Sequence, residues 1–104
     1  MRKVEQLNLV AKLRKDIYNM SKKSKRLERF MAVPSDYRLE ELIALLNDFD
    51  YLVENRGKTS GSAICFYNKK TKKKIMIHRP HPGNIIKKYC IRIIKEHLEQ
   101  EGLL

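Results

Sequence analysis

The stretch Ala63-Ile-Cys-Phe-Tyr-Asn-Lys-Lys-Thr-Lys-Lys-Lys-Ile-Met-Ile-His78 predicts a β-hairpin, and this hairpin decides the fold of the chain. Its two arms, Ala63–Tyr67 and Lys74–His78, are rich in residues that favour strands. The polar segment Asn68–Thr71 between them is typical of a turn. We therefore predict two neighbouring antiparallel strands joined by a lysine-rich connection.

A third strand and two helices are predicted on either side of the hairpin. Tyr51–Arg56 has the composition of a strand, and the polar segment Gly57–Gly61 after it is typical of a loop. Apolar residues at helical spacing predict one helix over Leu39–Phe49, with Asp36 as its N-cap, and another from Ile85 to about Glu101. The predicted fold is a two-layer α+β domain, with a three-stranded antiparallel sheet and helices on one face. Double-stranded-RNA-binding domains share this helix–strand–strand–strand–helix order.

The N-terminal third is predicted to be a basic helical extension over residues 1–33, followed by a domain over residues 34–104. Val4–Met20 has apolar residues at helical spacing, and Lys22–Met31 is a second, shorter helix that ends before Pro34. The first of these helices docks either on the core or on a partner. Alternatively, Met20 is the true start of the protein, which makes residues 1–19 an optional extension.

The charge of the chain favours a polyanionic partner. The 104 residues carry a net charge of +11, and Lys and Arg are concentrated in residues 1–33 and 63–104. Such a field attracts nucleic acid or an acidic protein, although a lysine-rich solvated surface has the same composition. Residues 34–62 are acidic overall, and we expect the helix that carries Glu40, Glu41 and Asp48 to face away from any nucleic acid.

Other features of the composition indicate a cytoplasmic protein without a cofactor or metal. Cys65 and Cys90 lie in apolar stretches, which favours buried free thiols, and no CxxC pair is present. No apolar run approaches the roughly 20 residues that span a bilayer, and no secretory signal is visible. We therefore expect no membrane association.

Three motifs in a fixed order point to a family. Leu42-Ile-Ala-Leu-Leu46 precedes Phe49-x-Tyr51, Gly57-Lys-Thr-Ser-Gly-Ser62 leads into Ile64-Cys-Phe66, and His81-Pro-Gly-Asn84 leads into the last helix. Over about residues 25–104 this set resembles the HicA family, the toxins of type II toxin–antitoxin pairs. The resemblance implies a messenger-RNA interferase, an endoribonuclease that inhibits translation and is neutralised by a HicB-type antitoxin that covers its active surface.

One position departs from the family motif, which reads Gly-Ser-His where this chain has Gly61-Ser62-Ala63. Metal-free cleavage of RNA needs groups that take a proton from the 2′-hydroxyl and return one to the leaving oxygen, and histidine can do either. Alanine can do neither. Three explanations stay open: a diverged subgroup that uses another residue, an inactive member that still binds RNA or antitoxin, or an engineered inactive version.

His81, His78 and Arg79 are the candidate catalytic residues. A histidine would act as acid or base, and the neighbouring arginine would stabilise the phosphate in the transition state. The competing interpretation is that these are strand-end and loop residues set by the prolines. The remaining candidates for RNA contacts are basic or hydroxyl side chains: Lys58, Ser60, Ser62, Lys70, Lys72, Lys73, Lys87 and Lys88. Two alternative functions are a non-catalytic RNA-binding module and a domain that binds an acidic protein.

Overall fold

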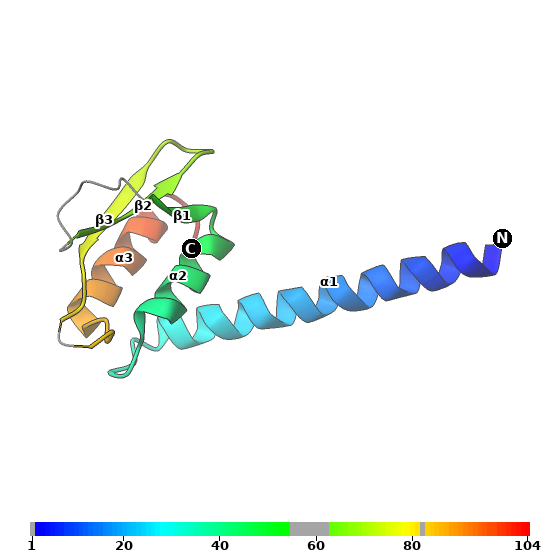
Figure 1. The fold of residues 1–104 in the computed structure, drawn as a ribbon, viewed down its shortest axis with the longest axis horizontal. Helices are drawn as coiled ribbons and strands as arrows, with labels where there is room; N and C mark the ends of the chain where they lie inside the picture. The colour runs from blue at the N-terminus through cyan, green and yellow to red at the C-terminus, as the bar shows by residue number, and fades with distance from the viewer. Residues whose placement is uncertain (1, 55–62, 82) are drawn as a thin grey trace.

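The structure is a computed structural model that describes residues 2–54, 63–81 and 83–104, and in the N-terminal helix the side chains of residues 9–18 and 20–31. The helices are α1 (Arg2–Met31), α2 (Leu39–Asp48) and α3 (Lys88–Gln100). The strands are β1 (Tyr51–Glu54), β2 (Ala63–Asn68) and β3 (Lys74–His78). Figure 1 shows α2 and α3 packed beneath the sheet, while α1 extends away from both.

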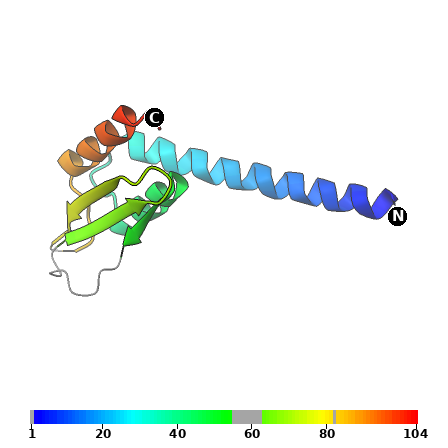
Figure 2. The ribbon, with the colours of Figure 1, turned by 90° about the horizontal axis from the view of Figure 1, so that it is seen from above.

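The three strands form one antiparallel sheet in the order β1-β2-β3. Helices α2 and α3 cover one face of this sheet, and no described element covers the other, the open face (Figures 1 and 2). The predicted two-layer α+β fold is therefore confirmed. The hairpin arms also agree with the prediction, because β3 has the predicted bounds and β2 is longer by one residue.

The core lies between the sheet and the two helices. Ile64, Phe66, Ile75 and Ile77 point inward from β2 and β3 and are buried. They meet a set of buried apolar residues from the helices: Leu39, Leu42, Leu45, Leu46, Ile91, Ile94 and Leu98. Full burial of each such side chain contributes about 1.5–3 kcal/mol, so this layer holds the sheet against the helices.

Helix α1 is one continuous helix, and the prediction of two separate helical segments was wrong. Ser21 lies between the two segments and does not interrupt the helix, which ends only near Pro34. Described side chains before Arg26 are all exposed, whereas Phe30 near the end of the helix is fully buried in the core. The helix therefore has a projecting part and a docked part, and it extends the molecule to 57 × 30 × 28 Å (Figure 2).

The docked part of α1 binds the acidic side of α2. Arg26 donates two hydrogen bonds to the carboxylate of Asp48, at 2.7 and 2.8 Å. Arg29 donates to the carboxylate of Glu41 at 2.5 and 3.1 Å. Bidentate pairs of this kind are among the stronger hydrogen bonds in proteins. Two of the three acidic residues predicted on the outside of α2 are thus neutralised by α1.

The Arg29–Glu41 pair makes stability depend on pH. Its hydrogen bonds lower the pKa of Glu41 from the usual value. Since the folded pKa lies below the unfolded one, the pair stabilises the fold above the unfolded pKa of about 4.3, and this contribution is lost as the pH falls through the folded pKa. We expect the free energy of unfolding in urea to fall between about pH 6 and about pH 3. The decrease should be shallower for Glu41→Gln, and an identical pH profile in the two proteins would contradict this role.

The ends of α2 and α3 differ from the sequence-based prediction. The N-cap of α2 is Arg38, not Asp36. The Arg38 backbone N–H donates to the Glu41 carboxylate at 2.8 Å, which satisfies a helix-end donor without Asp36. Asp36 instead accepts a hydrogen bond from Arg29 at 3.2 Å.

The last helix begins at Lys88, so Ile85 and Ile86 precede it. Ile85 forms an isolated β-bridge with Arg38, and the backbone N–H of Ile86 donates to the carbonyl of Tyr37 at 2.7 Å. These bonds hold the segment in an extended conformation. Helical spacing alone could not distinguish this extended segment from a first helical turn, because Ile86 is buried in either case.

Candidate functional site

Ala63 and His78 face each other across the start of β2 and the end of β3. Both lie on the open face of the sheet, because Ile64 and Ile77, the next pair, point into the core. The Cβ atoms of directly opposed residues in an antiparallel pair are about 4.5–5.5 Å apart. The exposed imidazole of His78 therefore stands next to Ala63.

The rest of the open face is mixed in character. Cys65 lies between Glu54 and Met76, and its thiol donates to the Glu54 carboxylate at 3.5 Å. In the next row, the Lys74 ammonium lies 5.9 Å from the ring centroid of Tyr67. The half-buried Tyr67 ring and the exposed Met76 thus give this face apolar surface beside positive charge.

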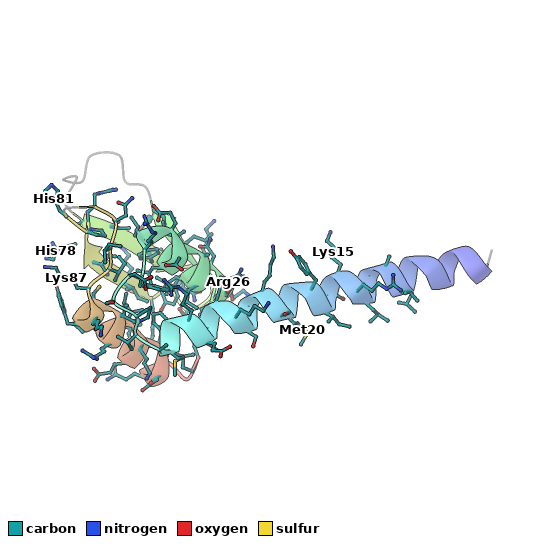
Figure 3. The ribbon with its side chains drawn as sticks, turned by 90° about the horizontal axis from the view of Figure 1, so that it is seen from below. Lys15, Met20, Arg26, His78, His81 and Lys87 are labelled. Carbon is teal, nitrogen blue, oxygen red and sulfur yellow. The ribbon has the colours of Figure 1, made fainter. Side chains whose placement is uncertain are left out.

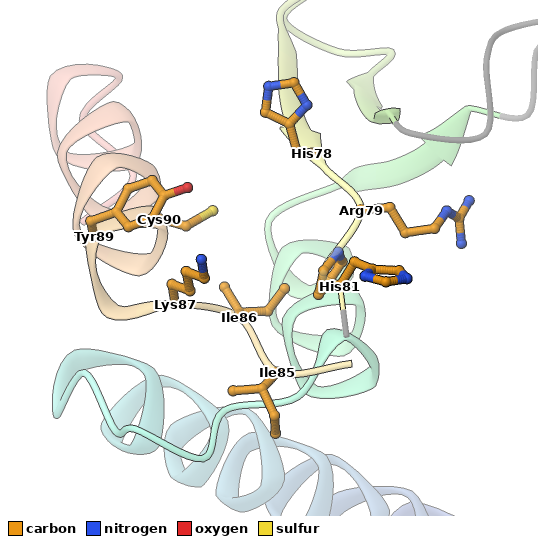
Figure 4. A pocket seen from close by; sticks show the side chains of 9 residues that line it. His78, Arg79, His81, Ile85, Ile86, Lys87, Tyr89 and Cys90 are labelled. Atoms are coloured by element: carbon orange, nitrogen blue, oxygen red, sulfur yellow. The ribbon is translucent and has the colours of Figure 1, made fainter. Parts of the chain in front are cut away.

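A pocket of about 310 Å³ lies between the end of β3, the connection that follows it and the start of α3. The residues around it are His78, Arg79, Pro80, His81, Ile85, Ile86, Lys87, Tyr89 and Cys90. In Figure 4, Tyr89 and Cys90 point from α3 toward the strand, and Lys87 points into the space between them and the β3 end. Arg79 and His81 extend to the side away from α3. The three catalytic candidates thus share one pocket, although their side chains do not converge on one point.

The lining of this pocket is basic and contains no carboxylate among the described residues. In the described part of the chain, neither the His78 nor the His81 ring has a hydrogen-bond or ion-pair partner in the protein. Burial raises the pKa of the Cys90 thiol, so this group is protonated at neutral pH and is not a nucleophile. The arrangement suits an anionic ligand held by cations, with imidazoles available for proton transfer.

The other RNA-contact candidates are separated into different places. Lys87 lines the pocket, and Lys88 is its exposed neighbour at the start of α3. Lys70, Lys72 and Lys73 lie in the hairpin connection, at the opposite end of β3 from His78. Figure 3 shows His78, His81 and Lys87 at the end of the molecule away from the projecting part of α1. Lys58, Ser60 and Ser62 lie outside the described residues.

The hairpin lysines have local partners of their own. Lys70 forms an ion pair with Asp50 at 3.0 Å, and the ammonium of Lys73 lies 3.9 Å from the Glu101 carboxylate. The turn itself is organised by buried Asn68, whose side-chain oxygen accepts from the backbone N–H groups of Lys70 and Thr71. Lys70, Lys73 and Asn68 at this end of the sheet therefore make contacts that stabilise the fold.

His97 belongs to a structural cluster at the end of the last helix. Its Nε2 lies 3.5 Å from the carboxylate of Glu101, which also accepts a 2.6 Å hydrogen bond from the hydroxyl of Tyr51. Burial, together with the Glu101 carboxylate, raises the pKa of Tyr51. The cluster ties β1 to the end of α3, away from the pocket.

Sequence reasoning missed three contributors to the pocket, Ile85, Ile86 and Cys90. Ile85 and Ile86 line the pocket because the β3–α3 connection turns back to pair with Arg38 and Tyr37, and spacing within one helix carries no signal for that turn. Cys90 lines it from the first turn of α3. Within the described residues, no group of three or more His, Cys, Asp or Glu side chains is arranged to hold a metal ion. None of the described helices has the length and apolar character needed to cross a membrane.

Comparison with known proteins gives no match, whether with family models, with curated proteins or with solved structures.

Proposed function

We propose that this chain is an RNA-targeting domain of the HicA type, a toxin that binds messenger RNA and cleaves it without a metal, with His78 as its acid–base residue. The observation that supports this proposal most is the pairing of Ala63 with His78 on the open face of the sheet. The histidine expected on β2 is replaced by one directly across from it on β3. In this proposal the acid–base histidine lies on β3 instead of β2, at the same place on the surface of the sheet.

The proposed reaction is transesterification within the RNA. A base takes the proton of a 2′-hydroxyl, the 2′-oxygen attacks the adjacent phosphorus, and the bond to the 5′-oxygen breaks as that oxygen takes a proton from a water molecule. The products are a 2′,3′-cyclic phosphate and a 5′-hydroxyl. His78 is the proposed base, and Arg79 and Lys87 stabilise the additional charge on the phosphate.

RNA binding draws on the pocket rim and the adjacent sheet face. Arg79, Lys87 and Lys88 supply positive charge for phosphates, and no carboxylate lines the pocket among the described residues. Tyr89 is 59% exposed beside the pocket, which leaves its ring available for stacking on an unpaired base. The acidic helix α2 lies on the covered face of the sheet, and two of its carboxylates are paired with arginines of α1, so its repulsion of the RNA backbone is weak.

The same surface is where an antitoxin of the HicB type would bind, in a cytoplasmic toxin–antitoxin pair. Strand β3 is an edge of the sheet, and its Met76 is exposed. A groove between β3 and α3 contains exposed Ile93 and Tyr89 and continues to His78. A partner that covers the groove would bury this apolar surface and would also block access to the pocket.

A second candidate is an RNA-binding module without cleavage. Efficient catalytic histidines are oriented by a hydrogen bond to their second ring nitrogen. Among the described residues none supplies such a bond to His78 or His81. This observation favours binding alone, and the experiment below distinguishes the two candidates.

The test is incubation of the purified protein with a single-stranded RNA in the presence of EDTA, at low and at physiological salt. The proposal predicts fragments that end in a 2′,3′-cyclic phosphate. It also predicts affinity that falls with salt by about 0.7 log units per log unit of salt for each phosphate contact. Salt-dependent binding without fragments would support the second candidate, and the absence of any RNA affinity would exclude both.

A further inference from the structure

The projecting part of α1 carries an apolar stripe that no described part of the molecule covers. Leu9, Val10, Leu13, Ile17 and Met20 are each 44–69% exposed. Helical segments in water gain most of their stability from packing an apolar face. A helix that projects from its domain with such a stripe on one side therefore has an unused interaction surface (Figure 1).

The spacing of this stripe is that of a coiled coil. Four of its members, Val10, Leu13, Ile17 and Met20, follow the alternating three- and four-residue steps of a heptad, in which positions a and d form the contact seam. Val10 and Ile17 occupy a, Leu13 and Met20 occupy d, and Leu9 flanks the seam at g. The next a position is the polar Ser24, where the apolar seam ends. β-Branched residues at a with unbranched-Cβ residues such as leucine at d favour two parallel strands. The seam is thus of the type that pairs with an identical helix.

Charges beside the seam are compatible with pairing between identical helices. In a parallel pair, position g of one helix lies near the next e of the other. This juxtaposes Lys23 with Glu28, which is an attractive pair, and Asp16 with Ser21. Leu9 meets Arg14. None of these described g–e′ contacts brings like charges together.

The basic residues of the projecting part lie mostly outside the seam. Lys12, Lys15, Lys22 and Lys25 occupy positions b, c and f. Figure 3 shows Lys15 and Met20 on opposite sides of the helix. The exposed aromatic Tyr18 is also off the seam, and the Lys22 ammonium lies over its ring at 4.7 Å. The excess positive charge would therefore face solvent in a dimer.

We propose that residues 9–24 of α1 pair with the same segment of a second copy of this chain, as a short parallel coiled coil. Docking on the domain uses Arg26, Leu27 and Phe30, which follow residues 9–24 along the helix, so each copy keeps its own α1–α2 contacts. The five exposed apolar side chains of each copy would remove on the order of 1,000 Å² from water in total, which lies at the low end of specific interfaces. The expected dimer is therefore concentration-dependent.

The test is sedimentation velocity of the full chain from about 1 μM to about 500 μM, a range that covers weak association. We expect the mass to rise from one chain to two across this range. Leu13→Glu and Ile17→Glu should stay monomeric at every concentration, because a charge at the seam cannot be buried. Tyr18→Glu is the matched control, an equally exposed position off the seam, and it should dimerise like the wild type.

A mass of one chain at every concentration in the wild type would overturn the proposal. Equal loss of dimer in Tyr18→Glu would overturn the assignment of the seam. A Met20→Cys variant tests the parallel direction, since it places two thiols opposite each other and should give a disulfide-linked dimer under mild oxidation. The unmodified chain, treated in the same way, is the control for cross-links through Cys65 and Cys90. A dimeric mass without a disulfide at position 20 would contradict parallel pairing.

Discussion

Replacement of His78 with alanine is expected to lower metal-free RNA cleavage by about 10²–10⁴-fold, the usual contribution of a positioned acid–base group. RNA affinity should change little, because the charges of Arg79, Lys87 and Lys88 remain. The side chain of His78 is exposed at the end of β3, so its removal leaves no cavity in the core. The rate of cleavage and the dissociation constant for the same RNA, measured separately, distinguish loss of chemistry from loss of binding.

His81→Ala is the matched control, since it removes the other pocket histidine. His81 follows Pro80 beyond the strand and extends away from α3, with no paired position on β2 (Figure 4). We therefore expect a much smaller loss of cleavage. Loss of activity in His81→Ala with full activity in His78→Ala would reverse the assignment of the two histidines.

A further test moves the imidazole from position 78 on β3 to position 63 on β2. Ala63→His should raise cleavage above the wild type, because it adds a second imidazole directly across from His78. In the double variant Ala63→His/His78→Ala, part of the activity lost in His78→Ala should return. No gain in either variant, with the proteins folded and still bound to RNA, would mean that this pair of positions is not the reaction centre.

Phe30→Ala is expected to destabilise the protein by about 3–5 kcal/mol, the range for removal of a fully buried phenylalanine. Phe30 is completely buried, and its ring centroid lies 6.0 Å from that of Tyr37. The effect would show that the last turns of α1 are part of the folded unit. The measurement is urea unfolding followed by far-ultraviolet circular dichroism.

Tyr18→Ala is the control for Phe30, because the exposed Tyr18 ring lies on the projecting part of the same helix. Its stability should remain within about 0.5 kcal/mol of the wild type, as for most surface substitutions. If Phe30→Ala lowered the free energy of unfolding by no more than Tyr18→Ala does, the result would contradict the docking of α1 on the domain. A large loss for Tyr18→Ala would show that the projecting part contributes to the domain's stability.

The hairpin and the layer architecture were predictable from the sequence, since alternation and turn composition are local signals. In β3, Ile75 and Ile77 alternate with the exposed residues Met76 and His78, and this pattern alone defines a sheet with one covered face. The stripe of α2 likewise identified the helix that covers that face.

Features that depend on contacts between distant segments were not predictable in this way. The burial of Phe30 depends on packing of the last turns of α1 against the core of the domain. The extended conformation of Ile85 and Ile86 depends on hydrogen bonds to the segment before α2.

The candidate site was predictable only in part. His78, Arg79 and His81 lie close in sequence, and Lys87 joins them because α3 begins beside the end of β3. The pairing of Ala63 with His78 required the strand register, which depends on the length of the hairpin connection. The hairpin lysines were grouped with the site on charge alone, and one strand length separates them from it.

The most direct test of RNA recognition at this surface is titration of the ¹⁵N-labelled protein with a short single-stranded RNA, followed by amide chemical shifts. We predict that the largest shifts fall on residues 63–67, 74–81 and 87–90, and that α2 changes little. Shifts confined to α1 or to the hairpin connection, or no shifts at all, would contradict the proposal that the Ala63–His78 face and its pocket bind RNA.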